Sequence, residues 1–235
     1  MVSLMNNIFC GMEKLSLVDF EKKLSCVLFV SGCNFKCPFC HNSSLMKVID
    51  DNIEFEEIKS YLVSRRKMLD AVVISGGEPT LRKELPFVIK EIKQLGYLIK
   101  LDTNGTNPVM LKKLIDEKLI DYVAMDIKAD FVNYPLVAGI KQNIYLEKVK
   151  ESINILKSSN IDYEFRTTLV LEYHTLDVIE SMKELIDGAP KLFLQKFVLR
   201  DSCLDQSLHE VPFDVANNYK EILEQNIKEV RLRGY

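Results

Sequence analysis

The sequence of 235 residues has no apolar run that could cross a membrane, which takes roughly 18 uninterrupted apolar residues. Its first residues, MVSLMNNIFCGMEKLSL, lack the basic segment and sustained apolar stretch of a secretory signal. Neither charge sign dominates, since 31 Lys and Arg against 34 Asp and Glu give a net charge of −3. We therefore expect a cytoplasmic protein that contacts neither membranes nor nucleic acid.

The signatures of several common enzyme classes are missing as well. No Ser-His-Asp arrangement and no phosphate-binding G-x-x-x-x-G-K-[ST] loop occurs, which argues against a hydrolase or a nucleoside triphosphatase. Two of the three histidines, His174 and His209, lie in loop-like segments, so we expect both at the surface. No linker divides the chain, which predicts one domain over 1–235, with a core at about 24–200 and a helical extension at about 212–235.

The apolar pattern predicts strands that alternate with helices. Near-continuous apolar segments, typical of parallel strands covered on both faces, lie at 26–31, 71–75, 97–102, 122–127, 163–170 and 192–198. Apolar residues at helical spacing fill the gaps, and Asn107 and Thr175 are the expected N-caps of two helices. Repeated strand–helix units predict an α/β fold, a partial (βα)6 barrel. A C-terminal helix from Pro212 and an edge strand in EVRLRGY follow.

Three of the six cysteines cluster directly after the first predicted strand. Cys33, Cys37 and Cys40 have the spacing C-x3-C-x2-C, and His41 follows. Such thiolates can converge on zinc, with His41 as fourth ligand, or on a 4Fe–4S cluster with one open iron. Adjacency of Cys40 and His41 disfavours zinc, because both side chains cannot easily point at one ion. The isolated cysteines are expected to behave as small apolar residues: Cys10, Cys26 and Cys203.

Further polar segments follow the next strands at the same end of the sheet, where active sites of such folds lie. They are SGGEPT at 75–80, DTNG at 102–105 and DIK at 126–128, with Arg166 and Thr168 on the fifth strand. Gly76 and Gly77 indicate a close backbone approach or a positive φ, and Glu78 is expected at the mouth of the site. Each segment alone is also compatible with an ordinary turn or a solvated ion pair.

The cysteine spacing, with Phe39 before the last cysteine and GGEP after the second strand, resembles the radical S-adenosylmethionine (radical SAM) superfamily. CNFKCPFCHN, DTNG and LSLVDF are similar to its glycyl-radical-enzyme activases, above all the activating proteins of anaerobic ribonucleoside-triphosphate reductase. Such activases usually have Pro-Gly after VD-aromatic, whereas Glu21 and Lys22 follow Phe20 here. No second cysteine-rich insertion occurs, so a ferredoxin-like domain is not expected.

This resemblance implies a 4Fe–4S cluster on Cys33, Cys37 and Cys40, with S-adenosylmethionine on the fourth iron. His41 then belongs to the subfamily signature rather than to the metal ligands. The resemblance further implies a monovalent cation beside the ribose and a set of cofactor contacts: Phe39, Gly76, Gly77, Glu78, Asp102, Thr103, Asn104, Asp126, Lys128 and Arg166.

The implied activity is that of an oxidoreductase: one electron cleaves S-adenosylmethionine to methionine and a 5′-deoxyadenosyl radical, which abstracts a hydrogen atom. The implied substrate is a glycine of a partner glycyl-radical enzyme, with a flavodoxin or ferredoxin as electron donor. A small molecule, as for 7-carboxy-7-deazaguanine synthase, or a peptide, as for peptide maturases, is the alternative substrate. A zinc-binding interaction module without catalysis is the alternative from a different class.

Overall fold

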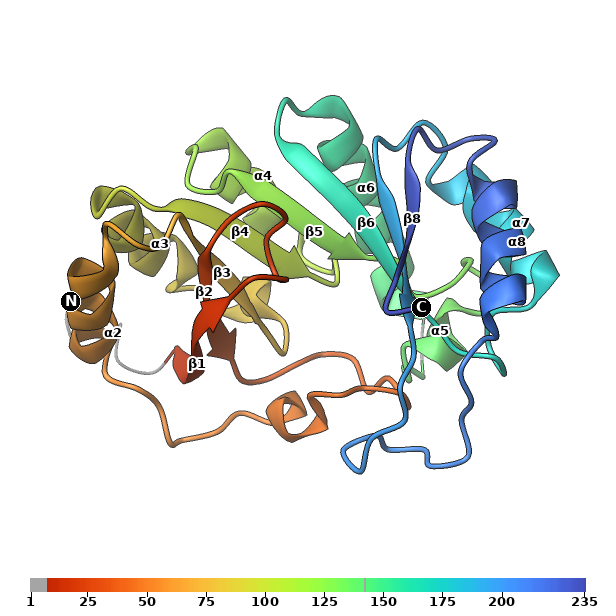
Figure 1. The fold of residues 1–235 in the computed structure, drawn as a ribbon, viewed down its shortest axis with the longest axis horizontal. Helices are drawn as coiled ribbons and strands as arrows, with labels where there is room; N and C mark the ends of the chain where they lie inside the picture. Colours follow the sequence, from red (N-terminus) through yellow and green to blue (C-terminus); the bar gives the residue numbers. More distant parts are fainter. Residues whose placement is uncertain (1–7, 142) are drawn as a thin grey trace.

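The fold is built on one eight-stranded sheet whose strands follow in chain order (Figure 1). The computed structural model describes residues 8–141 and 143–235. Residues 1–7, which begin the N-terminal segment considered above as a possible secretory signal, lie outside the described residues. β1 (Phe9–Ser16) runs antiparallel to β2 (Ser25–Val30). The other strands are parallel to β2: β3 (Ala71–Gly76), β4 (Leu98–Thr103), β5 (Tyr122–Asp126), β6 (Asp162–Leu169), β7 (Leu192–Lys196) and β8 (Val230–Arg233).

β1 and β8 are the two edges of this sheet, and within the described residues they do not pair with each other. The α/β fold with an open, partial barrel is thereby confirmed. All six predicted parallel strands are present, as is the edge strand near the C-terminus. β1 was not predicted.

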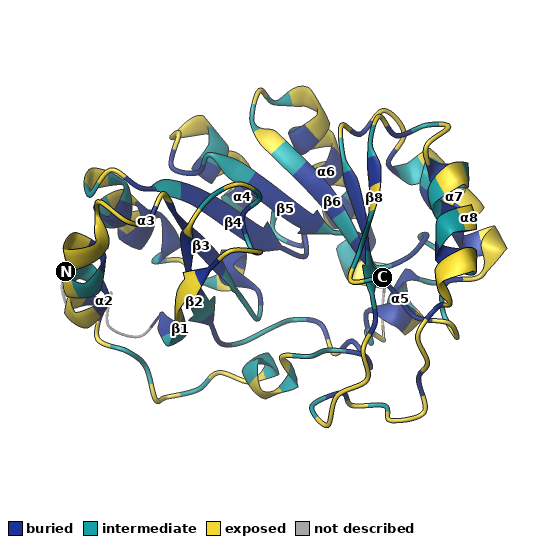
Figure 2. Ribbon diagram, viewed as in Figure 1, coloured by how far each residue is buried: buried dark blue, intermediate teal, exposed yellow. Residues whose placement is uncertain are grey.

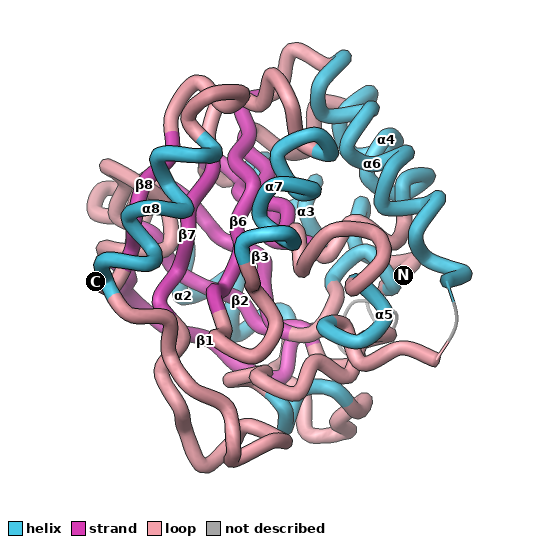
Figure 3. Tube along the Cα trace, turned by 90° about the vertical axis from the view of Figure 1, so that its right-hand side faces the viewer, coloured by secondary structure: helices cyan, strands magenta, loops and turns pink. Residues whose placement is uncertain are grey.

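Helices line the outer side of the sheet, as Figures 1 and 3 show. They are α2 (Phe55–Arg65), α3 (Leu85–Gln94), α4 (Pro108–Asp116), α5 (Tyr134–Val137), α6 (Leu146–Ser158), α7 (Leu176–Leu185) and α8 (Phe213–Leu223). Asn107 caps α4 as predicted, because its Oδ1 accepts from the Met110 N–H at 3.2 Å. Thr175 is the N-cap residue of α7 as predicted, but its side chain makes no capping hydrogen bond.

The pleat of the strands places alternate side chains on opposite faces of the sheet, the convex face under the helices and the concave face. Residues on the convex side, such as Val72, Ile74 and Met125, are fully buried against the helices. On the concave side, Val27 and Val73 pack with Phe20 in a smaller apolar cluster. Figure 2 shows the strands buried and the outer helix faces exposed. Because side chains alternate between the faces, polar side chains at the carboxyl ends of the strands can face the concave side.

The two edges of the sheet are also linked through loops. Glu21, between β1 and β2, forms ion pairs with Lys191 (3.0 Å) and Arg231, which lie at the start of β7 and on β8. At the other end, residues 197–211, which we call the clasp, lie beside the segment that follows β2 (Figure 1). The Asp205 N–H donates to the Pro38 carbonyl at 3.0 Å, and the Ser43 hydroxyl donates to the Ser202 carbonyl.

None of the helices within 8–141 and 143–235 combines the length and apolar character that crossing a membrane requires.

Replacing Asn107 with Ala should lower the free energy of unfolding by about 1 kcal/mol, because the cap of α4 is lost. The Asn107 amide also donates to the Thr80 carbonyl at 2.6 Å. The loss of stability should therefore be at least as large as that for a residue that only caps a helix. Denaturant titration measures the change. Asn154→Ala, at an exposed position within α6, is the matched control and should stay within about 0.5 kcal/mol of wild type. Equal stability of the two variants would contradict the capping role.

Candidate active site

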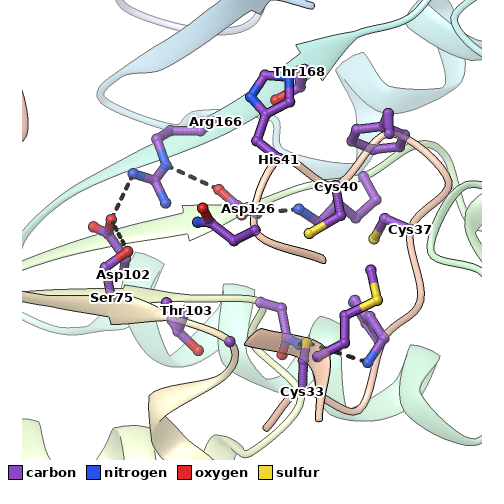
Figure 4. Close-up of a pocket in the computed structure, with 18 of the residues that line it drawn as sticks. Cys33, Cys37, Cys40, His41, Ser75, Asp102, Thr103, Asp126, Arg166 and Thr168 are labelled. Atoms are coloured by element: carbon purple, nitrogen blue, oxygen red, sulfur yellow. Dashed lines mark hydrogen bonds and ion pairs between the residues drawn. The ribbon is translucent and has the colours of Figure 1, made fainter. Parts of the chain in front are cut away.

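The three clustered cysteines lie in the loop that follows β2. This loop folds back on itself, since the N–H groups of Gly32 and Cys33 donate to the carbonyls of Leu45 and Met46. Cys33, Cys37 and Cys40 all line a cavity of about 250 Å³ at the carboxyl ends of the strands. Figure 4 shows their thiols around this common space. The loop thus presents three sulfur ligands to one cavity.

Burial keeps these thiols protonated in the metal-free protein. It raises the pKa of Cys33 to about 11 and that of Cys37 to about 12, and it also raises the pKa of Cys40. The thiolate, not the thiol, binds metals, so metal binding here must release protons.

His41 also lines the cavity, but its ring contacts the clasp. Its Nε2 lies 2.8 Å from the Val198 carbonyl of the clasp, and its ring stacks on Phe197. Among the residues that the structure describes, no three Cys, His, Asp or Glu side chains converge closely enough to hold a single ion. A cluster distributes its thiolate ligands over separate irons. Three thiols without a fourth donor beside them therefore fit a 4Fe–4S cluster that leaves one iron without a protein ligand.

Asn104 connects the turn after β4 to the cysteine loop. Its Nδ2 donates to Asn34 Oδ1 at 2.9 Å and lies 4.0 Å from Cys33 Sγ. Its Oδ1 accepts from the N–H and hydroxyl of Thr106, whose hydroxyl in turn accepts from Asn34 Nδ2. Neither Asn34, which stands within the cysteine motif, nor Thr106, which directly follows DTNG, was predicted as a site residue. Together these side chains fix Cys33 relative to β4.

Glu78 is fully buried, so its expected place at the mouth of the site is wrong. Its carboxylate accepts from the Thr103 hydroxyl at 2.7 Å and from the Asn104 N–H at 2.6 Å, and the N–H and hydroxyl of Thr80 donate to it as well. Burial raises the pKa of Glu78, and these donors oppose that shift. The carboxylate joins the turns after β3 and β4 and does not line the cavity.

Gly76 and Gly77 confirm the expected close approach. Gly76 has φ +111°, and a Cβ there would lie 2.4 Å from the Val30 carbonyl oxygen. A Cβ at Gly77 would lie 2.3 Å from the carbonyl oxygen of Gly32. Glycine is therefore needed at both positions for β3 to end against the cysteine loop.

A chain of charges forms the opposite wall of the cavity (Figure 4). Arg166 on β6 bridges Asp102 on β4 (3.0 Å) and Asp126 on β5 (2.9 Å), and Lys128 lies 2.9 Å from Asp126. Burial tends to raise the pKa of Asp126, but the charges of Arg166 and Lys128 prevail and lower it to about 2. The Ser75 hydroxyl donates to Asp102 at 3.0 Å. Of the predicted residues, this wall unites Asp102, Asp126, Lys128 and Arg166.

A second buried charge lies deeper on the concave side. The Lys100 ammonium is 3.7 Å from Asp102 Oδ1 and 3.6 Å from Glu164 Oε1, and it donates to the Asp19 carbonyl. Lys100 thus connects the β1–β2 loop, through Asp19, to Asp102 in the charged wall. Lys100 was not predicted as a site residue, although its position two residues before Asp102 places it on the same face of the sheet.

Other lining residues were not predicted as cofactor contacts: Met46, Ser75, Thr168 and Gln195. Thr168 and Gln195 stand opposite each other on β6 and β7. Phe39, Thr103 and Asn104 were predicted and do line the cavity. Alternation along β6 could have found Thr168, which stands two residues after Arg166 and on the same face. Gln195 is found only from the pairing of β6 with β7.

The two remaining histidines differ. His209 is exposed, as predicted, and its Nδ1 lies 2.6 Å from Glu172. The surface position predicted for His174 is wrong: the residue is fully buried between the end of β5 and α8. Cys26 and Cys203 are buried, whereas Cys10 is only partly covered.

These features define a class of protein. The sequence profile of the Radical SAM superfamily matches residues 27–186, and the chain belongs to this superfamily. It is a radical SAM enzyme, of the oxidoreductase type, and the family binds a 4Fe–4S cluster and S-adenosylmethionine.

Three characterised or named members of this superfamily are similar to the chain in sequence. A Methanocaldococcus jannaschii protein with the provisional name of glycyl-radical enzyme activating enzyme is 34% identical over 93% of this chain and 91% of its own. A second protein of that organism and name is 28% identical over 79% of this chain and 71% of its own. The 7-carboxy-7-deazaguanine synthase of Aquifex aeolicus is 25% identical over 73% of this chain and 75% of its own.

Solved structures share the fold. A radical SAM methyltransferase from Sphaerobacter thermophilus superposes with a TM-score of 0.70 at 15% identity, over 93% of this chain and 68% of its own. Streptococcus suis SuiB, solved with its precursor peptide SuiA, gives 0.65 at 14% identity, over 88% of this chain and 48% of its own. At such identities the likeness concerns the fold alone.

Replacing Gly77 with Ala should sharply reduce cluster loading, because the added Cβ collides with backbone rather than with a flexible side chain. Iron and sulfide content after anaerobic reconstitution measures the loss. Gly11→Ala is the matched control, since a Cβ there meets only the Phe29 side chain at an ordinary 3.5 Å. Wild-type iron content in the Gly77 variant would contradict the tight packing.

Acid should weaken the metal-free protein partly through Asp126. Its pKa is about 2 in the folded protein and nearer 4 when unfolded, so the ionised carboxylate stabilises the fold fully above about pH 4. This contribution, about 2 kcal/mol, disappears as the pH falls through about 2. In urea titrations at pH 5 and pH 2.5, Asp126→Asn should lose less stability on acidification than wild type, whereas exposed Asp162→Asn should behave like wild type. Equal acid sensitivity of wild type and Asp126→Asn would count against the ion pairs.

Proposed function

We propose that this protein activates a partner glycyl-radical enzyme by removing a hydrogen atom from a glycine Cα of that partner. The observation that carries the proposal is the 34% identity to the M. jannaschii relative named for this activity, which extends over almost the whole of both chains. A partner of the anaerobic ribonucleotide reductase type agrees with the cysteine and DTNG motifs. The electron donor in this proposal is a flavodoxin or a ferredoxin.

In this proposal Cys33, Cys37 and Cys40 hold the cluster, and the space between them and the charged wall receives S-adenosylmethionine. Bound there, these cofactors supply one-electron cleavage of the sulfonium and abstraction of a hydrogen atom by the resulting 5′-deoxyadenosyl radical. The chain itself positions the reactants. Lys128 offers a cation to the cofactor carboxylate, and Asp126 limits its mobility through their ion pair.

The remaining wall residues have complementary tasks. Asp102 faces the ribose, with its orientation set by Arg166 and Ser75. Glu78 does not contact the cofactors in this proposal. It positions Asn104, whose N–H donates to its carboxylate, and Asn104 in turn contacts Cys33. Phe39 is buried and lines the cavity, where its ring and backbone can cover the adenine.

The open sheet suits a polypeptide substrate. Within the described residues β1 and β8 do not pair, so no backbone ladder closes the concave side along this flank. A loop of a partner can enter there without strands having to separate. A short peptide could enter by the same route. The competing function is catalysis on a small molecule, which the similarity to the A. aeolicus 7-carboxy-7-deazaguanine synthase supports.

The test is activation of a candidate glycyl-radical enzyme under anaerobic conditions with reductant and S-adenosylmethionine. We expect an oxygen-sensitive glycyl doublet in electron paramagnetic resonance (EPR) and stoichiometric 5′-deoxyadenosine, because the hydrogen removed from glycine ends in that product. Formation of 5′-deoxyadenosine only with a small molecule or short peptide would refute the activase function.

Cys37→Ala is the negative control, since it removes one thiol of the cluster site and should abolish both products. Cys26→Ala, in the core away from the cavity, should retain them once stability is accounted for. A colourless, zinc-containing wild-type protein would contradict cluster chemistry altogether.

A further inference from the structure

His174 is a fully buried histidine for which the proposed reaction has no direct use. It lies in the turn between β6 and α7. Its Nδ1 is 3.0 Å from the Val170 nitrogen, and its Nε2 is 2.9 Å from the Lys128 carbonyl oxygen. Burial lowers the pKa of His174, which favours the neutral ring. The histidine is thus positioned to interact with the polypeptide that leads into the charged wall.

The hydrogen bonds select one tautomer of this ring. The Val170 N–H must donate to an unprotonated Nδ1, so the single proton resides on Nε2 and is donated to the Lys128 carbonyl. The Val170 carbonyl already accepts from the backbone N–H groups of Tyr173 and His174 and does not need the ring. A neutral histidine with its proton on Nε2 satisfies all of these groups at once.

The carbonyl that His174 binds lies beyond the last residue pair of β5 and β6, so the strand ladder does not hold it. The preceding carbonyl, that of Ile127, accepts from the Thr167 hydroxyl at 2.9 Å. His174 is itself anchored from α8, because the Tyr219 hydroxyl donates to its carbonyl at 2.7 Å. Two consecutive carbonyls after Asp126 are therefore fixed by side chains.

What these bonds position is the Lys128 side chain. Its ammonium is 2.9 Å from Asp126 and 5.9 Å from the centre of the Phe39 ring, which stands between Cys37 and Cys40. Lys128 lines the same cavity as Cys33, Cys37 and Cys40. Its ammonium therefore lies beside the space that the three sulfur ligands share.

We propose that His174 is a positioning residue that holds the Lys128 ammonium against the cysteine loop through its Nε2–H···O=C hydrogen bond, and that it thereby raises the reduction potential of the cluster. A nearby positive charge stabilises the extra electron of the reduced cluster. The inference rests on membership of the radical SAM superfamily and not on the identity of the substrate.

The experiment is an EPR-monitored reductive titration of the reconstituted full-length protein, without S-adenosylmethionine or partner. Lys128→Met should shift the potential to more negative values, because the cation is gone. His174→Phe, which fills the space but has no donor, should shift it in the same direction and by less. His174→Gln, whose amide can reach the carbonyl, should restore the wild-type value. His209→Phe, at an exposed histidine, should have no effect.

The double variant distinguishes positioning from general disturbance of the fold. With Lys128 replaced by Met, His174→Phe should cause no further shift, because no ammonium remains to be positioned. Additive shifts, or a wild-type potential in His174→Phe, would overturn the proposal. If His174→Phe takes up no cluster, His174→Asn and His174→Gln decide, since only Gln is long enough to reach Lys128. Equal potentials for those two variants would also overturn it.

Discussion

The bridge that Arg166 makes between Asp102 and Asp126 is the interaction on which the rest of the site depends. It joins three neighbouring strands at their carboxyl ends, where the backbone ladder stops and the strands would otherwise be free to splay. Charges shielded from water must be paired, and a missing partner is more costly than the pair is favourable. The wall is therefore sensitive to any change that removes one of its members, and its geometry holds the cavity open opposite the cysteines.

Much of this arrangement could be predicted from sequence because its signals are local. β2 to β7 are short, and several of them are nearly continuous apolar segments. The cysteine, GGEP, DTNG and DIK motifs each follow one of these strands. Parallel strands bring their carboxyl ends together, so the motifs had to meet. β1 was missed because the apolar residues of FCGMEKLS do not alternate regularly, and the segment becomes a strand by pairing with β2. α2 did carry a readable signal in Phe55, Ile58 and Leu62, all of which are buried.

The errors at Glu78 and His174 have a common physical origin. Both are polar residues in segments that look like turns, and such residues are usually exposed. Their partners are distant in sequence: Thr103 and Asn104 for Glu78, Lys128 and Tyr219 for His174. Burial of a polar group is possible only where such partners satisfy it, and a single sequence does not reveal which distant groups will be adjacent. Both residues act through others that line the cavity.

In the part of the chain that the structure describes, β1 and β8 are not paired, and loops make the contacts across this flank. At one end the clasp holds the cysteine loop by hydrogen bonds, and at the other Glu21 holds Lys191 and Arg231 by charge. Attraction between partly exposed charges weakens with ionic strength, whereas backbone ladders are largely insensitive to it. Salt can therefore weaken the ion pairs of Glu21 with Lys191 and Arg231 while every strand keeps its hydrogen bonds. How firmly the two edges of the sheet are held together is therefore a property of the surrounding solution as well as of the polypeptide.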